Sequence, residues 1–365
     1  MTEQSFSERL LAWYRGNKRD LPWRHDVTPY RVWISEIMLQ QTRVEAVKTY
    51  FLRFLSALPT VYDLAAVPDE VLMKLWQGLG YYSRARNLKK AAMEIVSRYG
   101  GMLPNTAEEL QTLPGIGRYT SSAIVSIAYG KRAAAVDGNV LRVYARVFGD
   151  ARDIAQEQTK RAFEAEILRL MPEESGTYEN GQNDCGDFTQ GLIELGATVC
   201  VPNGTPLCEA CPMAEICTAR REGSVDALPY KTKKAARRIE ERTVLLLTDG
   251  AHLGLVRRPE NGLLAGLYEP MNLCGAYDED AIRKALRDFG IREDAIGAIV
   301  PVGQAKHIFT HIEWHMTGYR VELSDLLHPA EIVFPSLREV EASYAIPSAY
   351  RFYMREFSAY AAEKH

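Results

Sequence analysis

Two short segments of this chain place glycines and a carboxylate where an anion and a positive centre could be bound together. Residues 113–120 have the sequence LPGIGRYT, and residues 136–139 have the sequence VDGN. The first segment predicts a helix that ends at Pro-Gly, a tight turn, and a second helix that begins near Tyr119. Gly115 and Gly117 carry no Cβ, so the N–H groups of this turn can approach a phosphate closely. The N-terminus of the second helix adds the positive end of its dipole.

Asp137, in the second segment, lies twenty residues after Gly117. A carboxylate beside an anion-binding turn suits a site that holds a DNA phosphate while positive charge develops nearby. The same aspartate is also well placed to cap a helix through residues 140–144. We expect Asp137 to serve both purposes.

A second carboxylate, Glu36, lies among apolar residues in segment 31–42 (RVWISEIMLQQT), which we predict to be a helix. Burying a carboxylate is costly unless the group is neutral or paired. A pKa raised by burial would suit Glu36 to donate a proton. The alternative is a structural carboxylate that is satisfied by the backbone or by Arg24.

Four of the six cysteines lie close together with the spacing C-x7-C-x2-C-x5-C: Cys200, Cys208, Cys211 and Cys217. Disulfide frameworks are uncommon in large cytosolic proteins, so we do not expect these cysteines to form one. Four thiolates at this spacing could hold one zinc ion or a [4Fe–4S] cluster, and the spacing alone does not choose between them. We expect the two remaining cysteines to be inert thiols.

The composition is that of a globular protein with more than one domain. The chain has 365 residues, of which 47% are hydrophobic and 25% are charged, and its formal net charge is -3. This length is enough for two or three domains. The net charge argues against a uniformly basic nucleic-acid-binding protein, although local basic patches decide phosphate affinity. Because we find no long uncharged apolar run and no signal peptide, we expect a cytosolic protein with no membrane partner.

The hydrophobic period divides the chain into three parts: a helical region at 1–222, a polar and basic linker at 223–242, and an α+β region at 243–365. The helical period extends from Phe6 to about Ile216. The last part predicts a strand, a tight turn and a strand, then a helix, then two further strands. These elements are expected at 244–247, 253–256, 280–286, 298–302 and 307–323, and a surface loop is expected at 178–187.

The glycine turn and the VDGN segment together resemble the helix-hairpin-helix DNA glycosylases. The cysteine spacing resembles the iron–sulfur loop of endonuclease III and its MutY relatives, which implies a [4Fe–4S] cluster. In those families the first gap is usually six residues, whereas this chain has seven. The extra residue falls in the loop 201–207, which contains Pro and Gly and could absorb it.

Tyr119 stands where the endonuclease III pattern has the lysine that forms a Schiff base. A phenol cannot form that imine, and the chain resembles the MutY-type adenine DNA glycosylases instead. The resemblance implies that Glu36 protonates adenine N7 and that Asp137 stabilises the sugar cation and bonds C1′ transiently. This is the logic of the two carboxylates of a retaining glycosidase. Tyr119 and Asn139 would orient water and Asp137.

The same resemblance implies a pocket for an extruded base and side chains that fill the vacated stack. The segment 21–24 (LPWR) matches the family's pattern near the adenine pocket. Leu79 and Tyr81 have a simpler alternative, packing between a helix and a turn. The implied pocket residues are Trp23, Arg24, Leu39, Gln190 and Ile193, the implied wedge residues are Gln41 and Tyr81, and Leu79 is a further residue expected to bind DNA.

The last part of the chain resembles the MutY C-terminal domain, which is related to the Nudix fold, through residues 262–270 (GLLAGLYEP). Residues 280–290 lack the acidic pairs of a working Nudix hydrolase, so we expect a reader of DNA and not a phosphohydrolase. Phe309, Thr310 and His311 match the family's Phe-Ser-His loop, which contacts 8-oxoguanine, with Thr in place of Ser. The alternative is an ordinary β-hairpin edge.

These observations predict a multidomain protein with an all-α helix-hairpin-helix glycosylase core, an iron–sulfur loop, and an α+β Nudix-like C-terminal domain. The resemblance implies a monofunctional, monomeric adenine DNA glycosylase. It would remove adenine opposite 8-oxoguanine or guanine in double-stranded DNA during base excision repair, in the cytoplasm and on the nucleoid. Two alternatives stay open: a bifunctional endonuclease III-like lyase, and a non-catalytic protein that binds damaged DNA.

Overall fold

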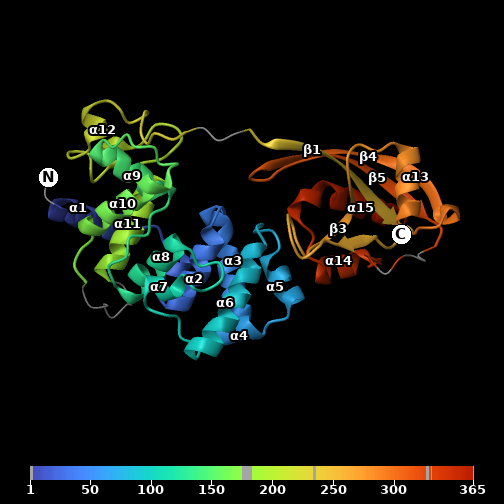
Figure 1. Ribbon diagram of the computed structural model, residues 1–365, viewed down its shortest axis with the longest axis horizontal. Helices are drawn as coiled ribbons and strands as arrows, with labels where there is room; N and C mark the ends of the chain where they lie inside the picture. The colour runs from blue at the N-terminus through green and yellow to red at the C-terminus, as the bar shows by residue number, and fades with distance from the viewer. Residues whose placement is uncertain (1–2, 175–182, 233–235, 326–328, 330, 365) are drawn as a thin grey trace. The chain divides into compact units, whose positions relative to one another are not determined.

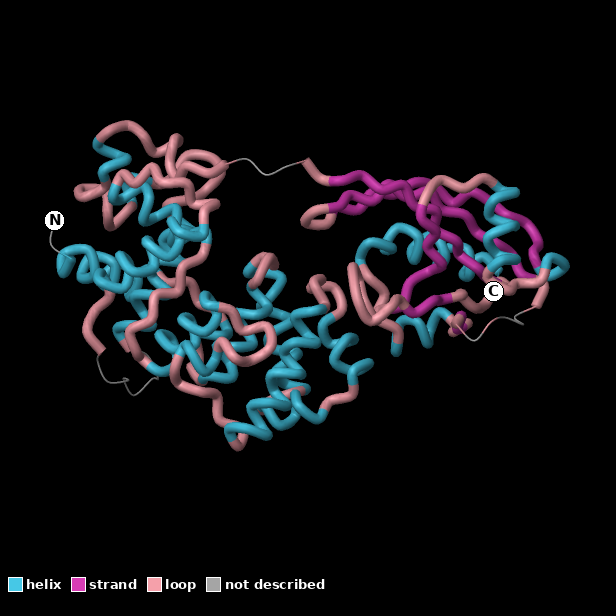
Figure 2. Tube along the Cα trace, viewed as in Figure 1, coloured by secondary structure: helices cyan, strands magenta, loops and turns pink. Residues whose placement is uncertain are grey.

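The computed structural model describes residues 3–174, 183–232, 236–325, 329 and 331–364. Contacts divide the chain into two compact units. Unit 1 contains residues 1–66 and 87–233, and unit 2 contains residues 67–86 and 234–365. Among the described residues, strands occur only in unit 2, whereas unit 1 is built from helices (Figure 2).

Most of the N-terminal helices belong to unit 1, and α6 crosses the boundary between the units at residue 86 (Figure 1). Their bounds are α1 (Glu3–Asn17), η1 (Pro22–Arg24), α2 (Pro29–Leu39), α3 (Val44–Ala57), α4 (Val61–Ala66), α5 (Asp69–Trp76, in unit 2), α6 (Ser83–Tyr99), α7 (Ala107–Leu110), α8 (Arg118–Tyr129), α9 (Gly138–Phe148), α10 (Glu157–Leu170), α11 (Asp184–Thr198), η2 (Cys208–Ala210) and α12 (Thr218–Arg221).

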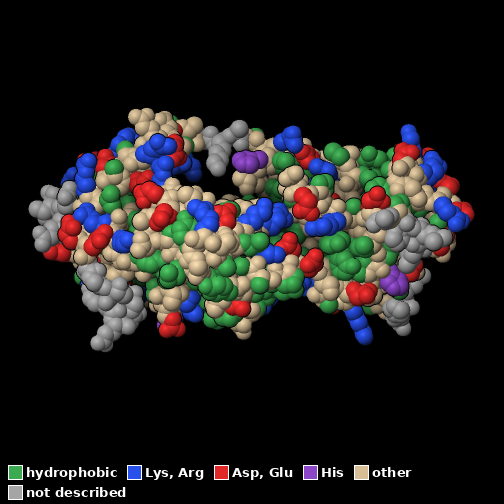
Figure 3. All heavy atoms as spheres, turned by 60° about the horizontal axis from the view of Figure 1, so that its bottom comes forward, with side chains coloured by type: hydrophobic (Ala, Val, Ile, Leu, Met, Phe, Trp, Pro, Cys, Tyr) green, Lys and Arg blue, Asp and Glu red, His purple; other side chains and the backbone are tan. Residues whose placement is uncertain are grey.

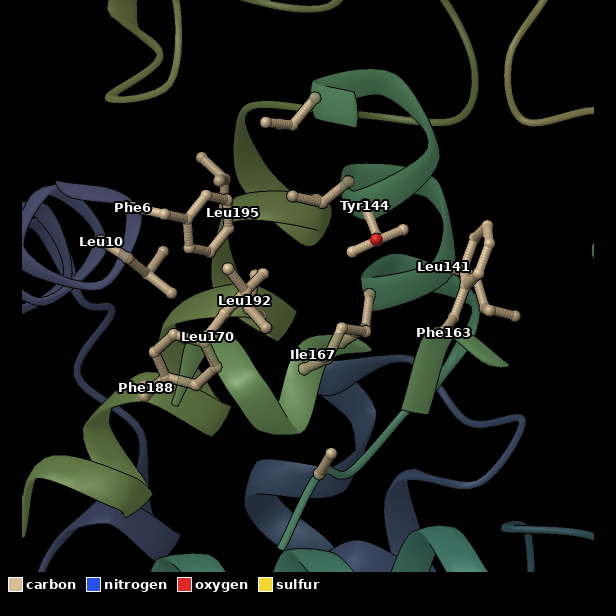
Figure 4. Close-up of a cluster of buried hydrophobic side chains, with 14 of the residues drawn as sticks. Phe6, Leu10, Leu141, Tyr144, Phe163, Ile167, Leu170, Phe188, Leu192 and Leu195 are labelled. Atoms are coloured by element: carbon tan, nitrogen blue, oxygen red, sulfur yellow. The ribbon is translucent and has the colours of Figure 1, made fainter. Parts of the chain in front are cut away.

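One core of unit 1 lies where α1, α9, α10 and α11 meet (Figure 4). Phe6 and Leu10 are one helical turn apart on α1 and are both buried, as are Phe188 and Leu192 on α11. The rings of Phe6 and Phe188 lie 6.3 Å apart. This spacing of four residues places the side chains of each pair on one apolar stripe of the helix. Packing of these stripes fixes α11 against α1 and α9.

The glycine turn and the Asp137 cap form as expected. The helix α8 begins at Arg118 with Gly117 as its N-cap. Gly115 has a φ of 77°, and a Cβ there would lie 2.7 Å from Cβ of Asn87. Both the backbone conformation and the close approach therefore require glycine at this position.

Two segments of unit 1 differ from the prediction. The helix that contains Glu36 ends at Leu39, and not at Thr42, because the chain turns at Gln41, whose φ is 58°. The predicted surface loop at 178–187 is wrong at its end, since Asn183 caps α11 and Asp187 is a buried residue of that helix. Residues 178–182 lie outside the described residues.

Unit 2 is built around a six-stranded sheet with the order β4-β5-β1-β3-β2-β6, in which only the β1–β5 pair is parallel. Val244 of β1 lies opposite Gly318 of β5. Its elements are β1 (Arg238–Thr248), β2 (Leu255–Arg257), β3 (Tyr268–Cys274), α13 (Glu279–Asp288), η3 (Glu293–Ala295), β4 (Ile296–Ile308), β5 (Ile312–Leu323), β6 (Ile332–Val333), α14 (Leu337–Ser343), η4 (Ser348–Tyr350) and α15 (Arg351–Lys364).

Alternation along β1 places one core on each face of this sheet. Val244 and Leu246 pack in a cluster with Tyr353 of α15, whereas Leu245 and Leu247 pack in a cluster with Ile282 of α13. Successive side chains of a strand point to opposite faces. The sheet therefore lies between α13 and α15, and all the residues of β1 from Thr243 to Thr248 are buried.

The strands of unit 2 form, but some of their predicted limits and pairings are wrong. The segments 244–247 and 253–256 meet at the predicted turn, where Thr248 and Leu253 form an antiparallel bridge and the N–H of Gly254 donates to the carbonyl oxygen of Leu247 at 2.8 Å. Beyond the turn the expected hairpin does not continue, because β1 lies between β5 and β3 while β2 pairs with β3 and β6. The segment 307–323 is not one strand, since β4 ends at Ile308 and β5 begins at Ile312. The strand β1 also begins at Arg238, inside the expected linker.

The surface drawn in Figure 3 carries mixed charge, with Lys and Arg side chains lying among Asp and Glu side chains. This mixture agrees with the small formal net charge. None of the helices in the described part of the chain is both long enough and apolar enough to cross a membrane.

Candidate active site

A cavity of about 490 Å³ in unit 1 gathers the side chains that the sequence singled out from five separate regions. This volume is within the usual range of small-molecule sites, about 300–1,000 Å³. The walls come from η1, α2, the start of α8, the start of α9, and α11. The predicted residues that line it are Trp23, Arg24, Glu36, Leu39, Gln41, Tyr119, Asp137, Asn139, Gln190 and Ile193.

Glu36 lies on α2 at the wall of this cavity and is only 7% exposed. Burial raises the pKa of its carboxyl from the ordinary 4.5 to about 7. A hydrogen bond from the hydroxyl of Tyr119 opposes this rise, while the charge of Asp137 adds to it. Glu36 is therefore a carboxyl that can hold a proton near neutral pH and donate it.

Arg24 lies in the same cavity, but its hydrogen bonds go to other groups. Its Nη2 donates to Oε2 of Glu194 at 2.8 Å and its Nη1 donates to the carbonyl oxygen of Arg19 at 2.8 Å. Its Nε donates to Oε1 of Gln190 at 3.2 Å. This geometry does not favour the alternative in which Arg24 neutralises Glu36 as a structural pair.

Asp137 is held as a carboxylate acceptor at the N-terminus of α9. Its Oδ1 accepts a hydrogen bond from the N–H of Val140 at 2.8 Å, which is the predicted cap. Its Oδ2 accepts from Nδ2 of Asn139 at 2.7 Å. Burial raises the pKa of Asp137, while these two hydrogen bonds oppose the rise by stabilising the charged form.

Arg142 links this carboxylate to the loop that carries the cysteines. Its Nη2 donates to Oδ1 of Asn139 at 2.9 Å and to the carbonyl oxygen of Gly196 at 2.7 Å. Its Nε donates to the carbonyl oxygen of Cys200 at 2.7 Å. The side chain of Asn139 is thereby fixed between Arg142 and Asp137.

The two carboxyl groups thus share one cavity but have different surroundings. Glu36 lies on a helix whose residues 32–38 are all buried, whereas Asp137 accepts hydrogen bonds at the positive end of a helix. Such a difference separates a proton donor from a charge that stabilises a cation. Tyr119 between them stays a neutral hydrogen-bond donor, because burial and both carboxylates raise its pKa well above 10.

The prediction from sequence missed Arg19 and Glu194, which also line the cavity. Glu194 is 1% exposed and accepts two hydrogen bonds from the guanidinium of Arg19. Its neighbours at 191–196 (GLIELG) are apolar or glycine. This is the signal that singled out Glu36, and it could have identified Glu194 as well.

The four clustered cysteines line a second cavity in unit 1 with Val143, Val147, Leu195 and Val199. Nη1 of Arg146 donates to Sγ of Cys200 at 3.3 Å. Among the described residues, no three side chains of His, Cys, Asp or Glu converge on the position of a single ion. The structure therefore brings the predicted ligands around one apolar space without a preformed site for one ion.

Of the predicted wedge and lesion-reading residues, Gln41 lines the cavity that contains the carboxyl groups, and the others belong to unit 2. In unit 2, a cavity of about 460 Å³ is lined by Leu79, Tyr81, Phe309, Thr310 and His311. The hydroxyls of Tyr81 and Thr310 lie 3.1 Å apart. Tyr81 is 45% exposed, whereas Leu79 is 6% exposed, as the alternative of simple packing expects.

Gly115 and Gly117 are exposed at the start of α8, outside the cavity that contains the carboxyl groups. Their position leaves the backbone of the turn accessible to a ligand. A phosphate at this helix terminus would be stabilised by the dipole of α8.

Replacing Glu36 by Gln should stabilise the protein at high pH. The folded protein holds the proton of Glu36 up to about pH 7, whereas an unfolded glutamate loses it near 4.5. Wild-type stability should therefore fall as the pH rises between these values, by up to about 3 kcal/mol. Thermal unfolding of both proteins from pH 5 to 8.5 should show the variant gaining stability over the wild type as the pH rises. A parallel pH dependence of the two proteins would contradict a protonated Glu36.

Comparison with known proteins agrees with the division of the chain into a helical region and a C-terminal region that contains the sheet. Residues 34–169 match the family model of the HhH-GPD superfamily of base excision DNA repair proteins. Residues 243–356 match the model of the NUDIX domain. The first match contains Glu36, Tyr119 and Asp137, and the second contains the sheet of unit 2 from residue 243 of β1 onward.

Two solved structures resemble the helical part of the chain. A thermostable thymine-DNA glycosylase is 31% identical, with a TM-score of 0.53, and the alignment covers 60% of this chain and 97% of that one. Endonuclease III in a non-covalent DNA complex is 25% identical, with a TM-score of 0.50, covering 61% of this chain and 98% of that one.

Relatives named adenine DNA glycosylase match a larger share of the chain. The rat protein is 35% identical over 92% of this chain and 73% of its own length. The human protein is 36% identical over 87% of this chain and 67% of its own length. Since these alignments include the helical region, the cysteine loop and most of the C-terminal region, the chain belongs to the adenine DNA glycosylase family.

Proposed function

We propose that this protein is a monofunctional DNA glycosylase that removes adenine mispaired with 8-oxoguanine or guanine during base excision repair. One observation supports this function most strongly: a single cavity holds Glu36 in apolar surroundings and Asp137 at a helix N-terminus. The names of the relatives point to the same base and the same reaction.

In this proposal the adenine enters the cavity after rotating out of the duplex. Glu36 gives its proton to N7 of the base, which makes adenine a better leaving group. The bond between C1′ and the base then breaks, and its electron pair leaves with adenine. The carboxylate of Asp137 stabilises the positive sugar, and water adds at C1′ while Glu36 takes up a proton.

The remaining residues of the cavity would hold these groups and the base. Tyr119 donates its hydrogen bond to Glu36, and Asn139 donates to Asp137. Gln190 presents an amide that can pair with an edge of adenine. Trp23, whose ring lies 5.7 Å from that of Phe51, forms an apolar wall.

The direct test is an assay of free adenine after incubation with a duplex that contains an 8-oxoguanine:adenine pair. Adenine should be released, and the strand should break only after alkali treatment. Release of thymine from a mismatch in place of adenine would favour the activity named for the structural neighbour. Binding without release of any base would favour the non-catalytic alternative.

Glu36→Gln and Asp137→Asn should each nearly abolish adenine release while leaving duplex binding largely intact. Each change removes the acid or the charge but keeps the size of the side chain, and Asn is as good an N-cap as Asp. Single-turnover rates and equilibrium binding should be measured for both variants. A near-normal rate in either variant would remove that residue from the mechanism.

The abasic product should stay uncleaved by this protein, because Tyr119 cannot form the imine that lyases use. Borohydride should therefore trap no enzyme–DNA adduct at the rate of base release. Trapping at that rate would instead support the bifunctional endonuclease III-like alternative. A slower adduct formed through a neighbouring lysine would leave the proposal standing.

We further propose that Cys200, Cys208, Cys211 and Cys217 hold a [4Fe–4S] cluster. The donor set consists of four thiols around one apolar cavity, and four cysteine thiolates are the ligand set of a [4Fe–4S] cluster. Because excision of a base is not a redox reaction, the cluster would have a structural role. When bound, it would cross-link the loop that carries the four cysteines.

The purified protein should be brown and contain about four iron and four sulfide per chain. Cys208→Ser or Cys211→Ser should reduce the iron content and the visible absorbance. Cys274→Ser, which changes an exposed cysteine outside the loop, should have no effect. Metal analysis that finds zinc and no iron would contradict the assignment.

We propose that Phe309, Thr310 and His311 in unit 2 read the base opposite adenine. They lie in the turn between β4 and β5, and Thr310 and His311 are exposed. A phosphohydrolase activity is not proposed, because α13 lacks the Arg-Glu and Glu-Glu pairs of the Nudix motif. The expected partner is duplex DNA, and the protein would act as a monomer in the cytoplasm and on the nucleoid.

Replacing Thr310 and His311 together by Ala should remove most of the preference for 8-oxoguanine over guanine. A good base contact contributes about 1–3 kcal/mol of discrimination, while the carboxyl groups lie in unit 1. Single-turnover rates on the two duplexes should therefore converge, with adenine release retained. His252→Ala, on the connection between β1 and β2, serves as a control. An unchanged rate ratio in the double variant would place lesion reading elsewhere.

A further inference from the structure

A buried carboxylate ties two arginines to one wall of the cavity. Glu194 of α11 is 1% exposed, and its Oε1 accepts hydrogen bonds from the backbone N–H of Arg19 at 3.0 Å and from Nε at 2.7 Å. Its Oε2 accepts from Nη2 of Arg19 at 2.9 Å and from Nη2 of Arg24 at 2.8 Å. All three residues line the cavity that contains Glu36.

We infer that Glu194 is a positioning residue, which orients Arg24 and Gln190 toward the base and balances the arginine charges beside the proton donor Glu36. The inference rests on the proposed function for the identity of the base. Its electrostatic part concerns the free protein and can be measured without DNA.

The geometric part follows from the order of the hydrogen bonds. Glu194 holds Arg24, and Nε of Arg24 in turn donates to Oε1 of Gln190 at 3.2 Å. An amide that accepts at its oxygen has its NH₂ group on the opposite side. The network therefore fixes which end of the Gln190 amide is oxygen, and so which atoms of a base it can recognise.

The same network fixes the chain between α1 and α2. Glu194 binds the backbone of Arg19, and Nη1 of Arg24 donates to the carbonyl oxygen of Arg19. Trp23 lies between these anchors and forms part of the cavity wall. Loss of Glu194 would release both ends of this short segment and the indole it carries.

The electrostatic part follows from the charges around the cavity. Arg24 of η1 and Arg19 ahead of it are positive, whereas Asp137 at the start of α9 and Glu194 of α11 are negative, and Tyr119 of α8 is neutral. Burial would raise the pKa of Glu194, but the hydrogen bonds from both arginines outweigh it and lower the pKa to about 2. Glu194 is therefore charged at neutral pH.

Removing the charge of Glu194 would leave the arginines without their counter-charge. A positive charge nearby favours the ionised form of a carboxyl group, and Arg24 already lowers the pKa of Glu36. Glu36 would then lose its proton at a lower pH. Since the proposed reaction needs that proton, excision would become slower at neutral pH.

A matched ion pair on the same two chain regions provides a control. Arg15 of α1 donates from Nε to Oδ2 of Asp187 on α11 at 2.9 Å, and Asp187 is 2% exposed. The carboxylate of Asp187 is buried to a similar degree as that of Glu194. Neither Arg15 nor Asp187 lines the cavity. Asp187→Asn should therefore reproduce a general loss of stability without changing Glu36.

The experiment is a ¹³C NMR titration of protein labelled at the glutamate side-chain carboxyl, with the Glu36 signal assigned by its absence in Glu36→Gln. The midpoint should lie near pH 7 in the wild type and be unchanged in Asp187→Asn. In Glu194→Gln the midpoint of Glu36 should fall by about half a pH unit or more. The high-pH limb of adenine release should move in parallel. Coinciding midpoints in all three proteins would overturn the inference.

A second comparison keeps the test decisive if Glu194→Gln does not fold. Arg24→Gln should raise the midpoint of Glu36, and the double variant Arg24→Gln/Glu194→Gln, which removes one charge of each sign, should return it toward the wild-type value. Equal midpoints in the single and double variants would overturn the inference. If the midpoints shift but the wild type releases no adenine, the proposed function fails while this inference stands.

Discussion

The cost of burying one carboxyl group governs the arrangement of the catalytic unit. Glu36 lies on the buried face of α2, where an ionised carboxylate is unfavourable, so the group retains a proton up to about pH 7. Asp137 lies in the same cavity but is stabilised by hydrogen bonds at the start of α9. A pocket with one protonated and one stabilised carboxyl can protonate a leaving group and support a cation in one step.

These two groups depend on packing far from the cavity. The core formed by α1, α9, α10 and α11 holds Asp137, Gln190 and Glu194 in one place, although they are far apart in sequence. Arg142 extends this arrangement by bonding both Asn139 and the carbonyl of Cys200. The cysteine loop therefore supports the position of Asp137 through a short chain of hydrogen bonds, which gives that loop a structural purpose in an excision enzyme.

Local features could be predicted from the sequence, and long-range pairings could not. The cap at Asp137 depends on neighbouring residues and formed as expected. The end of α2 was missed because Gln41 adopts a positive φ without being glycine. The pairing of β1 with β5 joins residues about seventy positions apart, and no local pattern specifies it. The partner of Arg24 was missed for the same reason, since Glu194 comes from the other end of unit 1.

In the proposed reaction the proton of Glu36 goes to N7 of the adenine. A duplex in which 7-deazaadenine replaces the target adenine tests this directly, because its ring carries a carbon at that position and keeps the rest of the base. We expect the protein to bind this duplex about as tightly as the adenine duplex but to release no base in a single-turnover assay. Release of 7-deazaadenine at a rate close to that of adenine would contradict it.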